Sequence, residues 1–111
     1  MASDSAAVLD GLCDDKGFLR DHRAWNQAVA EDFAALEGIE LSSAHWEIVE
    51  LVRIYHEKYD ASPANRALVN FVKQQRGPEM GNSIYLMSLF PGSPARVVSR
   101  IAGLPKPKNC L

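Results

Sequence analysis

The last ten residues, AGLPKPKNCL at positions 102–111, contain the side chain with the clearest chemical potential, a cysteine one position from the end. The thiolate is the nucleophilic form of cysteine, and nearby cations favour it. Lys106 and Lys108 place two positive charges within four residues of Cys110. The interspersed prolines favour an extended backbone, so the last eight residues would reach roughly 25 Å. The pattern indicates a nucleophilic thiol presented to another protein; the alternative is a disordered tail with an incidental cysteine.

The rest of the sequence shows no recognisable catalytic or metal-binding pattern. It has no Gly-rich phosphate loop and no GxSxG motif. His45 and His56 lie eleven residues apart on one predicted helix, about 16 Å along its axis, so they cannot share a metal ion through that helix. We interpret these two and His22 as surface or partly buried helical residues and expect no metal and no cofactor. Cys13 lies far from the arm in sequence and is interpreted as structural or incidental.

The net charge of −2 conceals a strong asymmetry between the two halves of the chain. Residues 1–60 contain five Lys/Arg and thirteen Asp/Glu, whereas residues 61–111 contain seven Lys/Arg and one Asp/Glu. A basic surface attracts an acidic protein or the phosphates of a nucleic acid. The predicted helix 63–76 is also basic, which leaves a non-catalytic regulatory or DNA-binding protein of the helix-turn-helix kind as an alternative. An ordinary solvated surface is the less specific alternative.

Size and composition are those of one globular domain that can bury its own core. The chain has 111 residues, of which 47% are hydrophobic and 23% are charged, which are ordinary globular values. No apolar segment approaches the roughly 20 residues that a membrane-spanning helix needs. The N-terminal residues do not resemble an export signal. We therefore expect a cytoplasmic protein with a single domain over residues 1–111.

Hydrophobic periodicity and turn residues predict the elements that support the arm. Two turn signals predict a short β-hairpin in a lead-in over residues 1–20. A helical body is expected over residues 21–103 and a mobile arm over residues 104–111. About five helices are expected, so the predicted fold class is mainly all-α, an orthogonal helical bundle. Their predicted start signals are Asp21 for the helix 22–38, Ser42 or Ser43, Ser62 with Pro63, Gly81-Asn82-Ser83, and Ser93-Pro94.

The sequence resembles the DsrC/TusE family of small sulfur-carrier proteins. The similarity covers most of the chain and is densest at the C-terminus, where AGLPKP precedes the penultimate cysteine. The matching stretches are GFL at 17–19, Trp25, LSSAHWEIVELVR at 41–53, SPANRALV at 62–69, GNSIYLMSLFPGSPA at 81–95 and IAGLPKPKNCL at 101–111.

The resemblance implies a helical domain with a small hairpin and a mobile arm, and a sulfurtransferase that holds persulfide sulfur on Cys110. It implies neither a cofactor nor a metal. In the TusE branch, sulfur comes from a TusBCD- or DsrEFH-like donor complex and goes to the tRNA 2-thiouridine synthase, which modifies the wobble uridine of tRNA. In the DsrC branch, the carrier works with dissimilatory sulfite reductase or in sulfur oxidation.

One position favours the TusE branch. Proteins of the DsrC type have a second arm cysteine eleven residues before the penultimate one, and this chain has Ser99 there. A serine cannot form a disulfide with Cys110. The resemblance therefore favours a relay through a single thiol, with a DsrC-like carrier as the alternative.

Four basic residues near the arm are candidates for docking a partner. Arg96 and Arg100 lie four residues apart and would share one face of the last predicted helix. We expect them, with Lys106 and Lys108, to steer the carrier onto an acidic partner or the tRNA complex. The alternative is that these four side chains only contribute to solubility.

Overall fold

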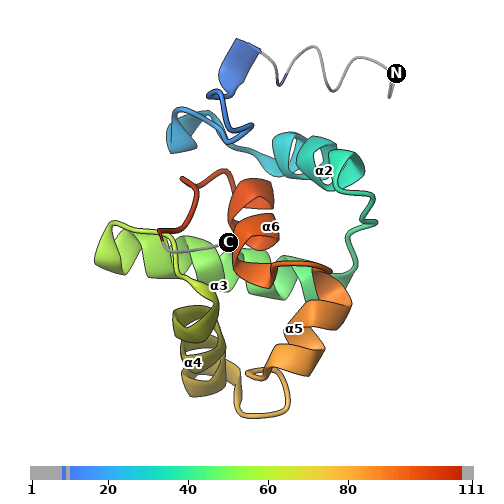
Figure 1. Cartoon of the computed structure of the whole chain (residues 1–111), viewed down its shortest axis with the longest axis vertical. Coiled ribbons are helices and arrows are strands. Elements are labelled where there is room, and N and C mark those ends of the chain that lie inside the picture. The colour runs from blue at the N-terminus through green and yellow to red at the C-terminus, as the bar shows by residue number, and fades with distance from the viewer. Residues whose placement is uncertain (1–8, 10, 109–111) are drawn as a thin grey trace.

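The computed structural model describes residues 9 and 11–108, and these residues form a mainly helical body (Figure 1). The predicted fold class and the number of about five helices are confirmed. None of the described helices is long and apolar enough to cross a bilayer. The elements are the 3-10 helix η2 (His22–Ala24) and the α-helices α2 (Gln27–Leu36), α3 (Ser43–Tyr59), α4 (Asn65–Arg76), α5 (Ser83–Leu89) and α6 (Pro94–Ile101).

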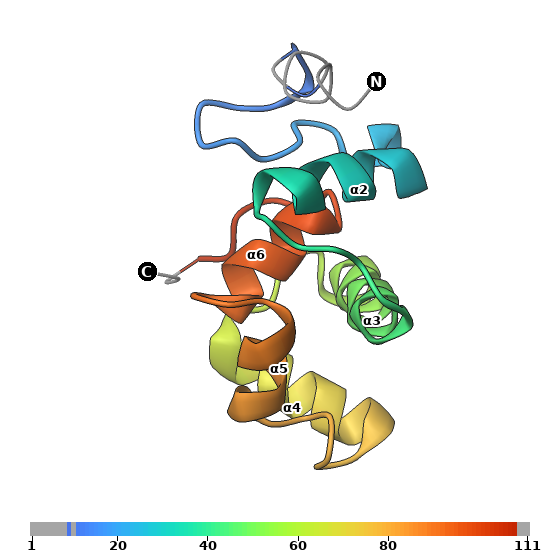
Figure 2. The same cartoon turned by 90° about the vertical axis from the view of Figure 1, so that its right-hand side faces the viewer.

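Helix α6 lies at the centre of the body. It contacts α2, α3, α4 and α5, and Figures 1 and 2 show it with α2 on one side and the α4–α5 pair on the other. Six of its eight residues are buried. Complete burial of an aliphatic side chain such as Ile101 stabilises the fold by about 1.5–3 kcal/mol. The helix that precedes the arm is therefore held firmly by its neighbours.

Three predicted helix starts are confirmed. Ser42 is the N-cap of α3. Asn82 is the N-cap of α5, and its side chain accepts a hydrogen bond from the Tyr85 N–H at 2.8 Å. Helix α6 begins at Pro94 after Ser93. Each of these capping signals acts within one helical turn, so the helix start can be predicted from neighbouring residues alone.

The predicted start of the first long helix at Asp21 is wrong. Asp21 caps only η2, by accepting a hydrogen bond from the Arg23 N–H at 3.0 Å. The backbone at Trp25 is extended, so the helix is interrupted there. Helix α2 starts afresh with Asn26 as its N-cap.

The start of α4 is also displaced from the predicted Ser62 and Pro63. The helix begins at Asn65 with Ala64 as its N-cap. The Ser62 hydroxyl instead donates to the carbonyl oxygen of Pro105 at 2.5 Å, a partner 43 residues away in the sequence. A long-range contact has replaced the local capping bond that serine makes so readily.

The described part of the lead-in forms a tight turn with one isolated antiparallel bridge, between Cys13 and Leu19. The Asp14 carboxylate accepts hydrogen bonds from the Lys16 and Phe18 N–H groups, at 2.9 and 3.0 Å. Cys13 and Leu19 are both buried in the hydrophobic core. Residues 1–8 and 10 of the predicted hairpin region lie outside the described residues.

Candidate functional site

Cys110, the predicted sulfur-carrying residue, lies outside the described residues, but the structure describes the base of the arm. Lys106 and Lys108 are exposed, whereas Leu104 and Pro107 are buried. The first residues of the predicted arm therefore pack against the body. Four residues follow Pro107, and fully extended they reach about 12 Å, half the reach expected for the whole arm.

A glycine-dependent turn ends α6 and leads into the arm. Gly103 has a φ of +72°, in the left-handed region that glycine adopts without strain. The Gly103 N–H donates to the Arg100 carbonyl at 3.1 Å, and the Leu104 N–H donates to the Ser99 carbonyl at 2.9 Å. These two bonds define a Schellman motif. The predicted role of Gly103 as the helix stop is confirmed.

Two side chains from other elements bind the last carbonyl groups of α6. The Trp25 indole Nε1–H donates to the Ile101 carbonyl at 2.8 Å, and the Arg53 guanidinium donates to the Ala102 carbonyl at 2.5 Å. The guanidinium also lies 4.0 Å from the centre of the Trp25 ring, so the two donors hold each other in place. Burial lowers the pKa of Arg53 from its ordinary value.

Gly103 packs against this pair without room for a side chain. A Cβ atom at that position would lie 2.4 Å from Cδ1 of Trp25. Beyond it, the Ser62 hydroxyl donates to the Pro105 carbonyl. We call Trp25, Arg53 and Ser62 the arm-root clamp, because they bind three carbonyl groups within five consecutive residues where the arm begins.

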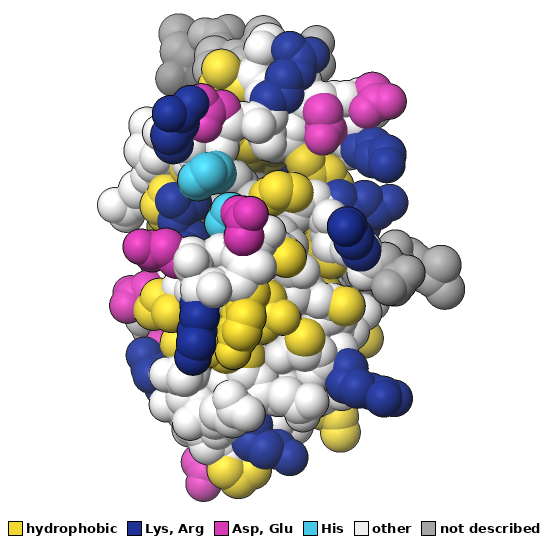
Figure 3. Space-filling model, turned by 90° about the vertical axis from the view of Figure 1, so that its left-hand side faces the viewer, with side chains coloured by type: hydrophobic (Ala, Val, Ile, Leu, Met, Phe, Trp, Pro, Cys, Tyr) yellow, Lys and Arg dark blue, Asp and Glu magenta, His cyan; other side chains and the backbone are white. Residues whose placement is uncertain are grey.

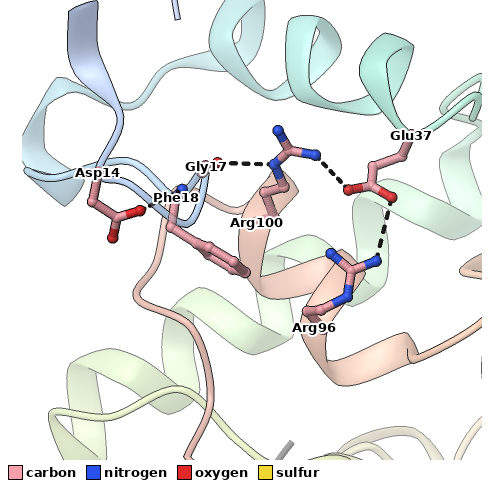
Figure 4. Close-up of polar contacts among 6 residues, drawn as sticks. All are labelled: Asp14, Gly17, Phe18, Glu37, Arg96 and Arg100. Atoms are coloured by element: carbon pink, nitrogen blue, oxygen red, sulfur yellow. Dashed lines mark hydrogen bonds and ion pairs between the residues drawn. The ribbon is translucent and has the colours of Figure 1, made fainter. Parts of the chain in front are cut away.

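Arg96 and Arg100 share a face of α6 as predicted, and both side chains pair with Glu37 (Figure 4). Nη1 of Arg100 lies 2.6 Å from one carboxylate oxygen of Glu37, and Nη2 of Arg96 lies 3.7 Å from the other. The Arg100 Nε–H donates to the Gly17 carbonyl at 2.9 Å. Arg100 thus ties α6 to the end of α2 and to the lead-in turn.

Replacing Arg100 with alanine is expected to lower the free energy of unfolding by about 3 kcal/mol. The substitution leaves the Glu37 carboxylate, which is 13% exposed, without its nearest partner. Urea unfolding followed by circular dichroism measures the change. The matched control is Arg23→Ala, because the Arg23 side chain is 82% exposed and its loss should change stability by no more than about 0.5 kcal/mol. Equal losses in the two variants would contradict this role.

Ser99 faces the core rather than the arm. It is fully buried, and within the described residues its hydroxyl oxygen has no hydrogen-bond partner. A buried hydroxyl without a partner costs about 1–3 kcal/mol. Position 99 is therefore on the face of α6 that packs into the apolar core.

His22 and His56 meet in a cleft beside the arm root, although 34 residues separate them. Their ring centres are 5.1 Å apart. The cleft has a volume of about 440 Å³ and is also lined by Arg53, Glu57, Asp60 and Leu104. Figure 3 shows histidine side chains on this face, bordered by basic and acidic groups. Burial, followed by the nearby His22 and Arg53, lowers the pKa of His56.

The lowered pKa of His56 predicts that the fold loses stability in acid. The folded protein binds the His56 proton more weakly than the unfolded chain does, so protonation favours unfolding. The loss should begin as the pH falls through about 6.5, the value in an unfolded chain. We expect His56→Gln to reduce the decrease in the urea midpoint between pH 7.5 and 5.5. An unchanged pH profile would show that His56 is not the responsible group.

His45 has a structural role, as interpreted from the sequence. Its Nδ1 accepts a hydrogen bond from the Ser42 N–H at 3.0 Å, so Nε2 is the protonated nitrogen and donates to the Leu89 carbonyl at 2.9 Å. The imidazole therefore joins the start of α3 to the end of α5. Both ring nitrogens are occupied in this way, and neither is available for chemistry.

Comparison with known proteins finds relatives over most of the chain. The family model described as "DsrC like protein" matches residues 10–111, nearly the whole chain. The chain belongs to the DsrC-like family. Its relatives include Sulfurtransferase TusE of Pectobacterium atrosepticum, which is 47% identical over 98 residues that cover 88% of this chain and 90% of the relative. The resemblance inferred from the sequence is confirmed.

Solved structures of family members share this fold. The NMR structure of Allochromatium vinosum DsrC has a TM-score of 0.79 and 43% identity, and the similarity covers 88% of each chain. The crystal structure of the oxidized gamma-subunit of dissimilatory sulfite reductase (DsrC) from Archaeoglobus fulgidus has a TM-score of 0.73 and 39% identity. That match covers 89% of this chain and 90% of the other.

Sequence reasoning missed the arm-root clamp in this member of the family. The four-residue spacing of Trp25, Val29 and Phe33 is that of an apolar helix face, and Ser62 has the residue type of an N-cap, so neither residue indicates a bond to the arm root. One signal was available for Arg53, which follows Trp46 by seven residues and Val49 by four and so lies on the apolar face of α3. A cation on an apolar face needs a specific partner, but the sequence does not say which.

Proposed function

We propose that this chain is a sulfur carrier with sulfurtransferase activity, in which Cys110 accepts sulfur as a persulfide and passes it to another protein. The observation that best supports the proposal is that the family match extends to residue 111 and so includes the arm and its cysteine. Relatives at 47% identity are named Sulfurtransferase TusE.

The transfer needs only thiol chemistry. The Cys110 thiolate attacks the outer sulfur of a donor cysteine persulfide, the donor S–S bond breaks, and a new S–S bond forms at Cys110. The donor cysteine leaves as a thiolate, so charge and electrons balance without an external oxidant or reductant. The acceptor cysteine then attacks the outer sulfur on Cys110 by the same displacement.

The proposed partners are those of the TusE branch. A TusBCD- or DsrEFH-like complex is the sulfur donor, and the tRNA 2-thiouridine synthase with its tRNA is the acceptor. The serine at position 99 supports this branch because its buried hydroxyl cannot supply a second thiol. Dissimilatory sulfite reductase is the alternative partner, since DsrC structures are similar to this chain at 39–43% identity.

Loading of sulfur tests the proposal directly. After incubation with a cysteine persulfide donor and removal of the donor, the intact mass should rise by about 32 Da, the mass of one sulfur. Peptide mapping after alkylation should place the added sulfur on Cys110. A folded sample that gains no mass, or gains it only on Cys13, would refute the proposal.

We further propose that the basic side chains around the arm root dock the carrier onto acidic partners. Lys106 and Lys108 are exposed and take the larger share of this role. Arg96 and Arg100 take a smaller share, because Glu37 already pairs with both.

Replacing Lys106 and Lys108 together with alanine should lower the transfer rate at low salt by about 3- to 10-fold and reduce its salt dependence, since charges at the rim of an interface act mainly on the association rate. The rate is measured against sodium chloride concentration. The matched control removes two exposed charges from α4, at Arg66 and Lys73, and should leave the salt dependence unchanged. An equal effect of both pairs would show that net charge matters rather than docking at the arm.

A further inference from the structure

The last carbonyl groups of α6 lie in the protein interior and accept hydrogen bonds from side chains of distant elements. The Schellman motif already satisfies the carbonyl groups of Ser99 and Arg100 with the backbone. The next two carbonyl groups, of Ile101 and Ala102, have no partner within the helix, and both residues are buried. Here they accept bonds from Trp25 and Arg53, which precede them by 76 and 49 residues.

The clamp continues beyond the helix into the arm. The Ser62 hydroxyl binds the Pro105 carbonyl, and Leu104 is 1% exposed. The carbonyl groups at both ends of the segment 101–105 are therefore bound to the body. The bond to Pro105 and the burial of Leu104 lie beyond the last turn of α6 and cap no helical carbonyl, so they concern the chain that follows.

We propose that the arm-root clamp of Trp25, Arg53 and Ser62 positions the carrier arm, by fixing the point from which the last residues leave the body. This inference rests on the proposed role of Cys110 as the sulfur carrier. With the clamp closed, four residues follow Pro107, the last described position that is buried. With the clamp open, eight residues follow Gly103, twice as many.

The length of the free segment determines how often Cys110 meets a target cysteine in a docked partner. The effective concentration at the end of a flexible segment falls roughly as the −3/2 power of its length, so doubling the length lowers it about threefold. The clamp should therefore change the rate of transfer within the docked complex. It should not change the affinity of docking or the intrinsic reactivity of the thiol.

The test compares variants that remove one donor each and keep the surrounding packing. Arg53→Met retains an unbranched side chain beside the indole, and Trp25→Phe retains an aromatic ring; Ser62→Ala removes only the bond to Pro105. Arg53→Lys restores a cationic donor and serves as the rescue variant. The control is Arg76→Met, which removes the ion pair (2.7 Å) between Arg76 of α4 and Glu47 of α3. Every variant carries Cys13→Ala, so that Cys110 is the single thiol.

Three measurements are made on each variant at a temperature where circular dichroism shows it folded. Cys110 is reacted with a small aromatic disulfide, and its persulfide is transferred in a single turnover to the tRNA 2-thiouridine synthase at saturating and sub-saturating concentrations. A nitroxide attached to Cys110 reports the motion of the arm. In the variants that remove a donor, we expect the rate of reaction of Cys110 with the aromatic disulfide to stay within twofold of the parent rate. The transfer rate at saturating acceptor should fall about threefold without a change in KM. The nitroxide lines should become sharper. Arg53→Lys should restore both readouts.

The inference and the proposed function fail in different ways. An unchanged nitroxide spectrum in Arg53→Met, Trp25→Phe and Ser62→Ala would overturn the clamp whatever the transfer rates, because a purely stabilising role does not alter the motion of the arm in folded protein. Unchanged saturating transfer rates would overturn it as well. If the parent protein takes up no persulfide, the carrier function fails, while the nitroxide comparison still tests the clamp.

Discussion

Replacing Gly103 with alanine is expected to lower the free energy of unfolding by about 3–4 kcal/mol, with two separable causes. Alanine at a φ of +72° is strained by about 1–2 kcal/mol. Its Cβ would also lie 2.4 Å from Cδ1 and 2.8 Å from Cγ of Trp25, so the indole must move. Movement of the indole breaks its hydrogen bond to Ile101 and its stacking on Arg53, which together contribute about 2 kcal/mol.

Gly38 provides the matched control for this experiment. Its φ is +74°, nearly the same as that of Gly103, and nothing lies within 4 Å of a Cβ built there. Gly38→Ala should therefore show the backbone strain alone. Urea unfolding of both variants measures the difference, which isolates the contact with Trp25. Equal losses at Gly38 and Gly103 would contradict the close packing of the arm root.

Replacing Cys110 with serine should reduce sulfur transfer to the rate measured without any carrier. Serine has nearly the same size, so the chain should fold with unchanged stability, but its hydroxyl cannot form a persulfide. The measurement follows radiolabelled sulfur from a cysteine persulfide donor through the carrier to the tRNA 2-thiouridine synthase and its tRNA. Loss of transfer with unchanged unfolding would separate the chemical role of Cys110 from a structural one.

The second cysteine of the chain is the natural control for that substitution. Cys13 is 8% exposed and lies in the hydrophobic core, so a persulfide donor cannot readily reach it. Cys13→Ala should therefore transfer sulfur at nearly the parent rate, although it loses some stability by opening a small cavity. Transfer that survives in Cys110→Ser but fails in Cys13→Ala would show that the wrong cysteine has been assigned.

Local signals in the sequence were sufficient wherever the interacting groups are close together along the chain. Ser42, Asn82 and Pro94 mark helix starts, and Gly103 marks a helix stop, because capping bonds and backbone strain act within about four residues. The same locality explains the errors. Asp21 and Ser62 have the residue types of N-caps. After Asp21, the extended backbone at Trp25 ends the helix within one turn. The Ser62 hydroxyl donates to the distant Pro105 carbonyl and does not cap α4.

The charges near the arm show the limit of reading one helix face by itself. The spacing of Arg96 and Arg100 placed them together on α6, as the structure confirms. It could not show that this face turns toward Glu37 of another element. Two arginines that read as docking charges are thus paired within the molecule. In the proposed docking role, this pairing leaves the larger share to Lys106 and Lys108, which are exposed.

The sequence by itself determined the helical class, the family and Cys110 as the candidate thiol. Hydrophobic periodicity and the terminal motif can each be recognised within a short stretch of sequence, without knowledge of how the helices pack. Only the tertiary structure decided how the arm is rooted. Trp25 and Arg53 reach the last carbonyl groups of α6 across 76 and 49 residues. Such contacts depend on how the helices pack, and sequence spacing contains no measure of that distance.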